Sequence, residues 1–460
     1  MMINKWINRI DMFNLSSDFR AFYDEYVVLP GETQSDLSKK KNNNIKWLKE
    51  GLVEYNKVKL TSYAIAETIV QGSMAMHTAV QNDNKDYDID VAIVMDKDTI
   101  GSIGSLAIKN VIVDALKLKC PNYKDEPEAK TNCVRIYYAE GYHIDFAIYR
   151  RYADYYNCIT FDHAGSTWRA RDPKAINGWF QDLIKKKGQD LRAVVRLLKM
   201  FCKSRESWQM PGGLILSVLC AEQFIQYDRL DYTFYMTIKG IRDRLVISQH
   251  ITNPTDITSS LILTEKHKSE VENLLSRLDS YIGKLDPLFQ SNCTETIARG
   301  LWRDFFNHAF WESSTANKAL SIFGPKSVTL PCQWRNTEEF IEDKFTTIDL
   351  YSVHISCTAM GDGYSRPLPL SHFGRIVPKH LSLTFEIDSC TVPEPYEVWW
   401  KIRNVGSEAK RRDDIRGQIT KGDKTKKEKT VFAGPHFAEC FIVKDGICVA
   451  RSRIDVPIGQ

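Results

Sequence analysis

The sequence lacks a long apolar run, a closely spaced cysteine pair and any low-complexity segment. No apolar stretch approaches the roughly 18 residues that a membrane-spanning helix needs. The 11 cysteines include no Cys-x-x-Cys pair, so neither a zinc site nor a disulfide framework is indicated. Residues 1–18 carry charges throughout and have no signal-peptide core. We therefore expect a cytoplasmic protein without a membrane partner.

An excess of one charge sign is also missing. Lysine and arginine number 62 and aspartate and glutamate 58, which leaves a formal net charge of +4. This mild charge is compatible with nucleotides as ligands and gives no strong signal for a nucleic-acid groove. With 43% hydrophobic and 26% charged residues the chain resembles ordinary globular proteins, and its 460 residues predict two or three domains.

One stretch stands out against this background, the alternating segment from Asp86 to Val94. Ile89, Val91 and Ile93 fall on one face of a predicted strand, and Asp88 and Asp90 fall on the other. Two carboxylates on one face repel each other, and a divalent metal is the commonest remedy. The alternative is a strand whose aspartates only face water.

A glycine and a serine precede this strand, at the end of another predicted strand. Residues 65–71 read as another strand, which breaks at Gly72-Ser73. A glycine lets the backbone approach a ligand closely, and the residues after it would open a short helix whose free N–H groups suit phosphate. Phosphate beside paired aspartates indicates metal-assisted phosphoryl chemistry.

A third aspartate follows on a neighbouring strand. Residues 103–119 predict an amphipathic helix, and residues 132–138 and 143–149 predict a strand pair around Glu140-Gly141. In the second of these strands Asp145 lies on the face opposite Ile144 and Phe146.

The polar run 39–44 lies in a predicted helix over 35–55. We interpret it as a solvent-exposed face of that helix, with RNA contact as the alternative.

The rest of the chain separates into a helical part and a β-rich part. Residues 173–310 are mostly helical in pattern, and Lys199 and Lys203 lie beside an apolar stripe over 191–202. Beyond a polar segment the pattern changes to strands, which predicts an all-β sandwich. Its core is expected to include Val398, Trp400, Ile402, Phe441 and Val443. The basic clusters 410–412 and 421–429 are expected in loops, and Lys444-Asp445-Gly446 predicts a hairpin.

Gly72-Ser73, Asp88-Ile89-Asp90 and Asp145 together resemble the motif of the polymerase-beta-like nucleotidyltransferases. The closer likeness is to the bacterial cGAS/DncV-like enzymes (CD-NTases, SMODS type), which make cyclic oligonucleotide signals in anti-phage defence. Residues 191–199 and 211–214 resemble the helical half of that family. Residues 395–406, 416–417 and 434–436 resemble the adenylyl/guanylyl-cyclase and SMODS C-terminal sensor domain.

The resemblance implies an α+β fold, a polymerase-beta-like nucleotidyltransferase with a helical half followed by a small all-β sandwich. The expected divisions are 1–170 for the catalytic core with N-terminal helices, 171–312 for the helical half, 313–327 for a linker and 328–460 for the sensor-like domain.

The resemblance also implies nucleotidyl transfer from NTPs, ATP among them, with loss of pyrophosphate and with Mg²⁺ or Mn²⁺ as cofactor. Asp88 and Asp90 would bridge two metal ions, and Asp145 would complete the catalytic site on the nucleophile side. The triphosphate would be held by residues outside this trio, namely Gly72, Ser73, Thr78 and Lys199, with Lys203 as the rival lysine.

Two departures from the family pattern concern the triphosphate. The family often has glycine where this chain has His77 before Thr78, so the turn there is expected to differ. The family often has Pro-Ser-Gly where this chain has Pro211-Gly212-Gly213. The serine that the family uses is therefore missing or displaced to Ser217.

Three functions stay open on the sequence. The first is a cyclic di- or trinucleotide synthase whose product acts on a downstream effector. The second is a nucleotidyltransferase that modifies an RNA end or a protein hydroxyl, and the third is a catalytically silent nucleotide sensor. The C-terminal domain shows no metal-ligand spacing, so we expect it to receive an activating ligand, through Arg416, His436 and basic loops, or to serve only packing or solubility.

Overall fold

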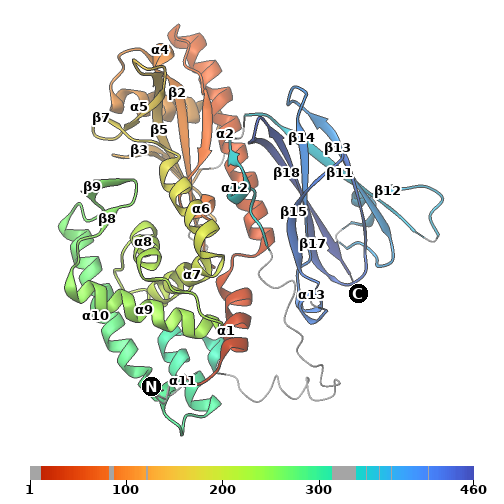
Figure 1. The fold of residues 1–460 in the computed structure, drawn as a ribbon. Helices are drawn as coiled ribbons and strands as arrows, with labels where there is room; N and C mark the ends of the chain where they lie inside the picture. The colour runs from red at the N-terminus through yellow and green to blue at the C-terminus, as the bar shows by residue number, and fades with distance from the viewer. Residues whose placement is uncertain are drawn as a thin grey trace, which may run out of the picture. The chain divides into compact units, whose positions relative to one another are not determined.

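The computed structural model describes residues 12–81, 87–120, 123–312 and 338–459, apart from residues 349, 362, 375 and 413 (Figure 1). These residues divide into two compact units. The helical unit contains the described residues of 12–30, 72–87 and 175–312, and the sheet unit contains those of 31–71, 88–174 and 338–459. The predicted linker at 313–327 lies outside the described residues, and the four predicted domain boundaries remain predictions.

The helical unit is built on six long helices. They are α6 (Ala175–Lys187), α7 (Asp190–Lys203), α8 (Gly213–Gln223), α9 (Leu230–Ile247), α10 (Glu265–Lys284) and α11 (Glu295–Phe306). The shorter elements are α1 (Ser16–Phe22), η1 (Tyr23–Val27), α3 (Gly72–Ala75), η2 (Asp286–Phe289), η3 (Ala309–Trp311) and the hairpin of β8 (Thr252–Asn253) and β9 (Asp256–Ser260). The mostly helical pattern predicted for 173–310 is confirmed, although β8 and β9 were missed.

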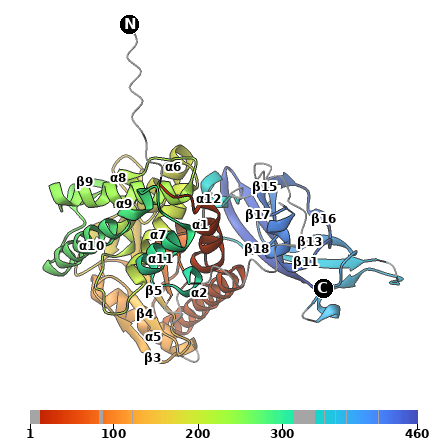
Figure 2. The same cartoon turned by 90° about the horizontal axis from the view of Figure 1, so that it is seen from below.

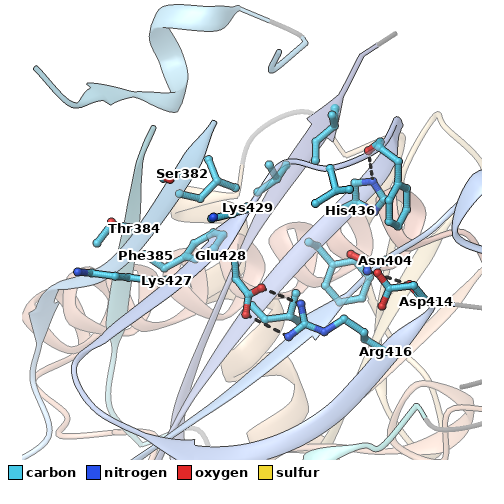
Figure 3. Close-up of a pocket in the computed structure, with 17 residues that line it drawn as sticks. Ser382, Thr384, Phe385, Asn404, Asp414, Arg416, Lys427, Glu428, Lys429 and His436 are labelled. Atoms are coloured by element: carbon cyan, nitrogen blue, oxygen red, sulfur yellow. Dashed lines mark hydrogen bonds and ion pairs between the residues drawn. The ribbon is translucent and has the colours of Figure 1, made fainter. Parts of the chain in front are cut away.

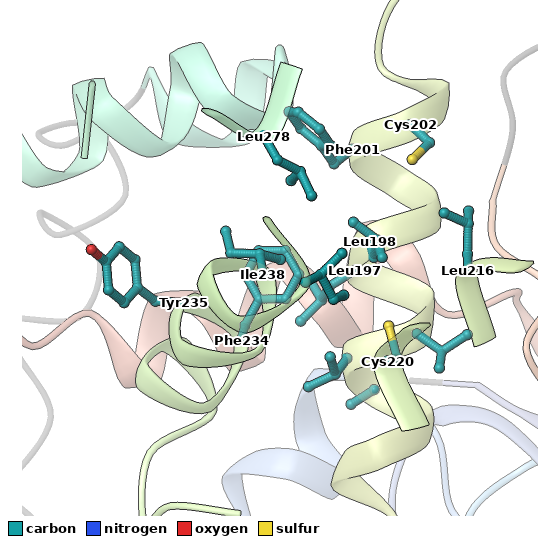
Figure 4. Close-up of a cluster of buried hydrophobic side chains, with 14 of the residues drawn as sticks. Leu197, Leu198, Phe201, Cys202, Leu216, Cys220, Phe234, Tyr235, Ile238 and Leu278 are labelled. Atoms are coloured by element: carbon teal, nitrogen blue, oxygen red, sulfur yellow. The ribbon is translucent and has the colours of Figure 1, made fainter. Parts of the chain in front are cut away.

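Aromatic and aliphatic side chains fill the middle of the helical unit. Phe201 of α7 stacks on Phe305 of α11 with ring centroids 4.2 Å apart. Figure 4 shows Leu197, Leu198 and Phe201 of α7 among side chains of the neighbouring helices. Phe19 of α1 packs edge-on against Trp302 at 4.6 Å, so the N-terminal helix belongs to this core. The predicted division at residue 170 places this helix with the catalytic core.

A seven-stranded sheet forms the first part of the sheet unit. Its strands are β1 (Glu67–Val70), β2 (Asp88–Asp96), β3 (Asp125–Ala129), β4 (Val134–Tyr137), β5 (His143–Ala153), β6 (Ile159–Ala164) and β7 (Trp168–Ala170). The main order is β1-β2-β5-β4-β3, while β6 pairs with β5 and β7. β2 and β5 are parallel, and the other pairings are antiparallel. Helix α4 (Lys97–Ile100) follows β2.

Two long helices accompany this sheet, α2 (Gly31–Lys59) and α5 (Ser105–Lys119). They approach so closely that a Cβ at Gly51 would lie 2.0 Å from the Ala115 carbonyl oxygen, which explains the glycine. The prediction that 39–44 is a solvated face is wrong at two positions, since Lys41 and Asn44 are buried. Asn44 accepts a hydrogen bond from the Tyr138 hydroxyl at 2.6 Å, because this side of α2 faces the protein interior.

The β domain, residues 338–459, consists of two sheets (Figure 2). The five-stranded sheet has the order β10 (Thr346–Thr347), β18 (Ile447–Ile458), β17 (Gly434–Lys444), β14 (Glu397–Arg403) and β15 (Arg416–Gly422). The four-stranded sheet has the order β12 (Leu368–Pro369), β11 (Val353–Met360), β13 (Ser382–Cys390) and β16 (Thr425–Lys429). Short helices are α12 (Ile341–Lys344), η4 (Leu370–Phe373) and α13 (Ser407–Arg411).

The predicted sandwich core is correct for one face only. Val398 and Trp400 of β14 lie in the cluster between the two sheets, and Ile402 packs against it. Phe441 and Val443 instead join a second cluster with Ile341 and Ile419 on the other face of the five-stranded sheet. The central strand β17 is covered on both faces, so its alternate residues enter different cores.

The basic clusters do not lie in loops. Residues 421 and 422 end β15, residues 425–429 form β16 at the edge of the other sheet, and residues 410 and 411 belong to α13. Lysines on both sides of an edge strand hide the alternation that would otherwise have identified it. The hairpin at Lys444-Asp445-Gly446 is confirmed, with φ of 50° at Asp445 and 74° at Gly446, as a two-residue type I′ turn requires.

No helix among the described residues is long and apolar enough to cross a lipid bilayer.

Candidate active site

The three aspartates meet on two neighbouring parallel strands of the sheet unit. In the register of β2 and β5, Asp90 lies directly beside Asp145, and Asp88 lies beside His143. The opposite face of the same strands carries Ile89, Ile144 and Phe146, all fully buried. Burial of that apolar face sets the orientation of both strands, so the carboxylates are directed to one face of the sheet.

The carboxylates become less exposed toward the middle of the sheet. Asp88, the first residue of β2, has an exposed side chain, Asp90 is half-buried and Asp145 is buried. The Gln71 amide, one residue beyond β1, donates to the Asp90 carbonyl oxygen at 2.9 Å. The end of β1 is therefore fixed beside the aspartate strand, and the chain enters the Gly72-Ser73 turn from there.

Repulsion in this cluster is visible at Asp90. Burial raises the pKa of its carboxyl to about 6, and the neighbouring Asp88 and Asp145 contribute to the same rise. A carboxyl in this environment carries its negative charge at a cost in free energy. A cation placed among the three groups would remove that cost.

Basic side chains already face two of the three carboxylates. Arg135 of β4 binds Asp145 with both ends of its guanidinium, Nε to Oδ1 at 2.7 Å and Nη2 to Oδ2 at 2.6 Å. His143 contacts Asp88 through Nε2. These contacts raise the pKa of Arg135 and of His143, chiefly through the hydrogen bonds to Asp145 and Asp88.

The Arg135 contact was missed in the sequence, although a signal was present. Arg135 and Asp145 lie at equal distances from Glu140, the centre of the predicted strand pair, and they are register partners in the structure. In an antiparallel pair such positions lie opposite each other on one face.

The donor set fits magnesium when part of its coordination shell comes from a substrate. Among the described residues no three His, Cys, Asp or Glu side chains form a ready-made metal cage. Mg²⁺ commonly uses one or two carboxylates and completes its shell with water and phosphate oxygens, so a protein cage is not required. Three carboxylates on adjacent strands, one of them with a raised pKa, meet this description.

The turn after β1 belongs to the helical unit. Gly72 has φ of 63°, and the Thr78 amide donates to the Ser73 carbonyl oxygen at 2.8 Å. His77, where the family often has glycine, adopts φ of 51°, a left-handed conformation in which histidine is tolerated better than most residues. The histidine therefore adopts a glycine-like conformation in this turn.

Helix α7 holds this turn with buried cations. Lys199 donates from Nζ to the Thr78 hydroxyl at 2.8 Å and to the Thr78 carbonyl oxygen at 3.1 Å. Arg192 donates from Nε to the Met76 carbonyl oxygen at 3.0 Å. A Cβ at Gly213 would lie 3.1 Å from Lys199 Nζ, so the glycine leaves room for the lysine. The role of Arg192 was missed, although a cation within an apolar helical stripe was a signal.

The other residues predicted to bind the triphosphate are either exposed at a helix end or buried in the helical unit. Lys203 is exposed at the end of α7, whereas Lys199 is 7% exposed. Ser217 is fully buried and donates to the Gly213 carbonyl oxygen at 2.8 Å. Thr78 is also fully buried, so its contact is with Lys199. The predicted site residues thus form two groups: Asp88, Asp90 and Asp145 in the sheet unit, and Gly72, Ser73, Thr78 and Lys199 in the helical unit.

Two protein families match separate parts of the chain. The family described as "Cyclic GMP-AMP synthase DncV-like, nucleotidyltransferase domain" matches residues 66–149, which contain all three aspartates. The family described as "Adenylyl/Guanylyl and SMODS C-terminal sensor domain" matches residues 335–459. The second match covers the β domain.

One curated relative is similar along most of the chain. A cyclic GMP-AMP synthase from Escherichia albertii is 25% identical over 441 residues, which is 91% of this chain and 88% of that protein.

Solved structures share the fold. The Vibrio cholerae DncV cyclic AMP-GMP synthase superposes with a TM-score of 0.51 at 18% identity, over 64% of this chain and 96% of that one. The Bradyrhizobium diazoefficiens CD-NTase CdnG, solved with GTP, superposes with a TM-score of 0.50 at 14% identity, over 67% and 98%. The predicted α+β class with a DncV-like, polymerase-beta-like fold is confirmed.

Proposed function

We propose that this chain makes a cyclic di- or trinucleotide from NTPs with Mg²⁺. The chain belongs to the bacterial cGAS/DncV-like nucleotidyltransferases. It carries a C-terminal sensor domain of the adenylyl/guanylyl-cyclase and SMODS type. It is an enzyme of the cyclic oligonucleotide synthase class. The name of the Escherichia albertii relative supports a product that contains adenine and guanine. The observation that carries the proposal is the pairing of Asp90 with Asp145 beside Asp88.

The chemistry is the formation of a phosphodiester. A ribose hydroxyl of one nucleotide forms a bond to the α-phosphorus of another, and the bond from that phosphorus to the pyrophosphate breaks. Divalent metal held by Asp88, Asp90 and Asp145 would lower the pKa of the attacking hydroxyl and stabilise the charge on the pyrophosphate. The fixed register of β2 and β5 holds the carboxylates in position before substrate binds.

The triphosphate has its own proposed ligands. Ser73 and the backbone of Gly72 would bind phosphate oxygens, and Lys199 would add a positive charge. We assign Thr78 a positioning role, because it is buried and binds Lys199 directly. The exposure of Lys203 and the hydrogen bond of Ser217 within α8 favour neither as a triphosphate ligand.

The test is direct. Purified full-length protein is incubated with ATP, GTP, CTP and UTP and with Mg²⁺ or Mn²⁺, and the products are identified by mass spectrometry. We expect a cyclic oligonucleotide and pyrophosphate. Asp88→Asn, Asp90→Asn and Asp145→Asn should each remove nearly all turnover while the protein stays folded. Asp98→Asn, an exposed aspartate of α4, is the matched control and should retain full activity.

Other outcomes would identify the alternatives. Label transferred from NTP to RNA or to a protein would replace the synthase assignment by a macromolecular nucleotidyltransferase. NTP binding without any product would favour the silent sensor. Full activity in any of the three asparagine variants would contradict the metal assignment.

The biological setting is also proposed. Synthesis would take place in the cytoplasm, where the NTPs are, and the product would carry the signal of phage infection to a downstream effector. A ligand at the β domain would activate synthesis. Cells carrying the Asp90→Asn variant should then lose any protection against phage that the intact protein provides.

A further inference from the structure

A cavity of about 560 Å³ lies within the β domain (Figure 3). It is lined by β13 and β16 of the four-stranded sheet and by β14, β15, β17 and β18 of the five-stranded sheet. Binding sites for small molecules in proteins usually measure about 300–1,000 Å³, so the cavity has the size of a ligand site. None of the described cysteines of the domain lines it, and the lining consists of apolar side chains and an ion pair with further polar residues.

Most of the wall is apolar and aromatic. Phe385 of β13 and Phe432 are buried and line the cavity, together with the aliphatic side chains of Leu383, Ile402, Val456 and Ile458. A surface of this kind favours an apolar body, because its burial removes apolar area from water.

One charged pair faces this wall. Arg416 of β15 binds Glu428 of β16 with both guanidinium ends, Nη1 to Oε2 at 2.7 Å and Nη2 to Oε1 at 3.0 Å. The pair joins the edge strands of the two sheets, as Figure 3 shows. The Arg416 side chain keeps a third of its surface exposed, so other groups can reach it.

The local backbone turns Arg416 toward the cavity. Between Lys401 and Arg403 of β14 the register of β15 shifts, and Arg416 and Gly417 have φ of 59° and 118°. A bulge of this type changes the direction in which a side chain points. A Cβ at position 417 would lie 3.0 Å from the Glu338 Cα, so glycine is required next to the arginine.

The other charged lining residues differ in the face of the strand that they occupy. Lys427 and Lys429 alternate with Glu428 along β16, so their side chains lie on the exposed face of that strand, and Asp414 is the further carboxylate among the lining residues. His436 contributes no charge, because Val405 N–H donates to its Nδ1 at 3.1 Å and its Nε2 lies 3.0 Å from the Phe432 carbonyl oxygen. Both ring nitrogens are used, so Arg416 is the cationic side chain of the described lining that faces the cavity, and the ligand role of His436 stays a prediction.

We infer that this cavity binds a small molecule with an apolar or aromatic body and one anionic end. The body occupies the phenylalanine wall, and the carboxylate, sulfonate or phosphate takes the place of Glu428 on Arg416, a geometry suited to bidentate oxyanions. Binding would exchange the link between β15 and β16 for a link to the ligand. That this exchange alters synthesis rests on the proposed function, while the binding itself does not.

The first experiment measures binding by the full-length protein without NTP. The probe is 8-anilinonaphthalene-1-sulfonate, which has an aromatic body and one sulfonate, and its fluorescence is titrated. We expect Arg416→Gln to weaken binding about tenfold, and Glu428→Gln to strengthen it several-fold because the competing carboxylate is gone. Lys421→Ala, on the same strand but outside the cavity, is the control and should bind like the parent protein.

A structural salt bridge would behave differently. If the pair only holds the two strands together, the two variants should change probe affinity in the same direction, and that result would overturn the inference. If a single variant fails to fold, the double variant Arg416→Gln/Glu428→Gln, which keeps a neutral hydrogen-bonded pair, is used in its place. Val431→Trp, at a half-exposed lining residue, leaves the pair intact and should abolish binding by filling the cavity.

Competition then separates the sources of the anion. Displacement of the probe by dodecanoate but not by dodecanol indicates a carboxylate on an apolar chain, and displacement by AMP indicates a phosphate on a nucleoside. Displacement by dodecanol as strongly as by dodecanoate would contradict the need for an anion. Bound probe with unchanged NTP turnover would support the site and count against its regulatory role.

Discussion

At the scale of single residues, the aspartate site is a case of charge compensation before substrate arrives. Arg135 forms an ion pair with Asp145, His143 contacts Asp88, and the pKa of the Asp90 carboxyl is raised. Such partners keep three carboxylates folded side by side when metal is absent.

The first prediction concerns Asp90 in metal-free protein. Its pKa is raised from 3.8 to about 6, so the folded state binds more protons than the unfolded state between these values. The free energy of unfolding should therefore fall as pH rises through this window, by about 3 kcal/mol for a group shifted this far. Asp90→Asn should raise Tm at pH 8 in EDTA and change it little at pH 4. Equal effects at both pH values would exclude this explanation.

The second prediction concerns Arg135. Arg135→Gln leaves Asp145 without its bidentate partner and should lower the stability of the metal-free protein by about 1–3 kcal/mol. Magnesium can then supply the missing positive charge, so saturating Mg²⁺ should raise Tm more in the variant than in the parent protein. Thermal melts with and without Mg²⁺ measure both effects. Arg169→Gln, at an exposed position on β7, is the control, and an unchanged Mg²⁺ response in the Arg135 variant would contradict the assignment.

At the scale of elements, α7 packs its apolar residues into the core and carries buried cations, two of which donate hydrogen bonds to the 72–78 turn. Arg192, Arg196 and Lys199 are all buried, and they bind Met76, Tyr23 and Thr78 respectively. A buried cation of this kind is stable only with its acceptors in place, so helix and turn support each other.

The third prediction follows from this arrangement. Lys199→Ala should raise KM for NTP about tenfold or more, because a charged contact of about 1.5–3 kcal/mol is lost. Lys203→Ala should leave KM within about twofold, since that side chain is exposed at the helix end. Thr78→Val, which removes the hydroxyl that holds Lys199, should fall between them. Steady-state kinetics on the three variants tests this, and equal small effects would mean that another group binds the triphosphate.

At the scale of the whole molecule, the β domain has hydrophobic cores of its own. The cluster between its sheets and the cluster on the outer face of the five-stranded sheet draw only on residues 341–458. The large core of the helical unit draws on residues 12–311. Domains with separate cores commonly fold independently.

The fourth prediction is therefore a truncation. A chain that ends at residue 327 should stay folded and should bind Mg²⁺ and NTP like the full-length protein. Altered basal or ligand-triggered synthesis would support a regulatory β domain. An unchanged rate, product and response to phage lysate would leave the β domain a packing or solubility module. Circular dichroism, thermal melts and product analysis on both chain lengths provide the comparison.

The sequence by itself determined the strand that carries Asp88 and Asp90, because alternation of apolar and acidic residues has only one reading on a half-buried strand. It also determined the break at Gly72, the helical region and most strands of the β domain. These features depend on residues that are neighbours along the chain, so the periodicity of apolar and polar residues in the sequence predicts them. The family resemblance added the roles of the residues, which periodicity cannot supply.

Only the tertiary structure decided which distant residues meet. The parallel register that sets Asp90 beside Asp145, the guanidinium on Asp145 and the burial of Lys199 but not Lys203 depend on how separate elements pack. The lysine-rich strand β16 was invisible to alternation, because an edge strand can carry charge on both of its faces. The cavity in the β domain exists only once the two sheets close over a shared core, and no local pattern encodes that closure.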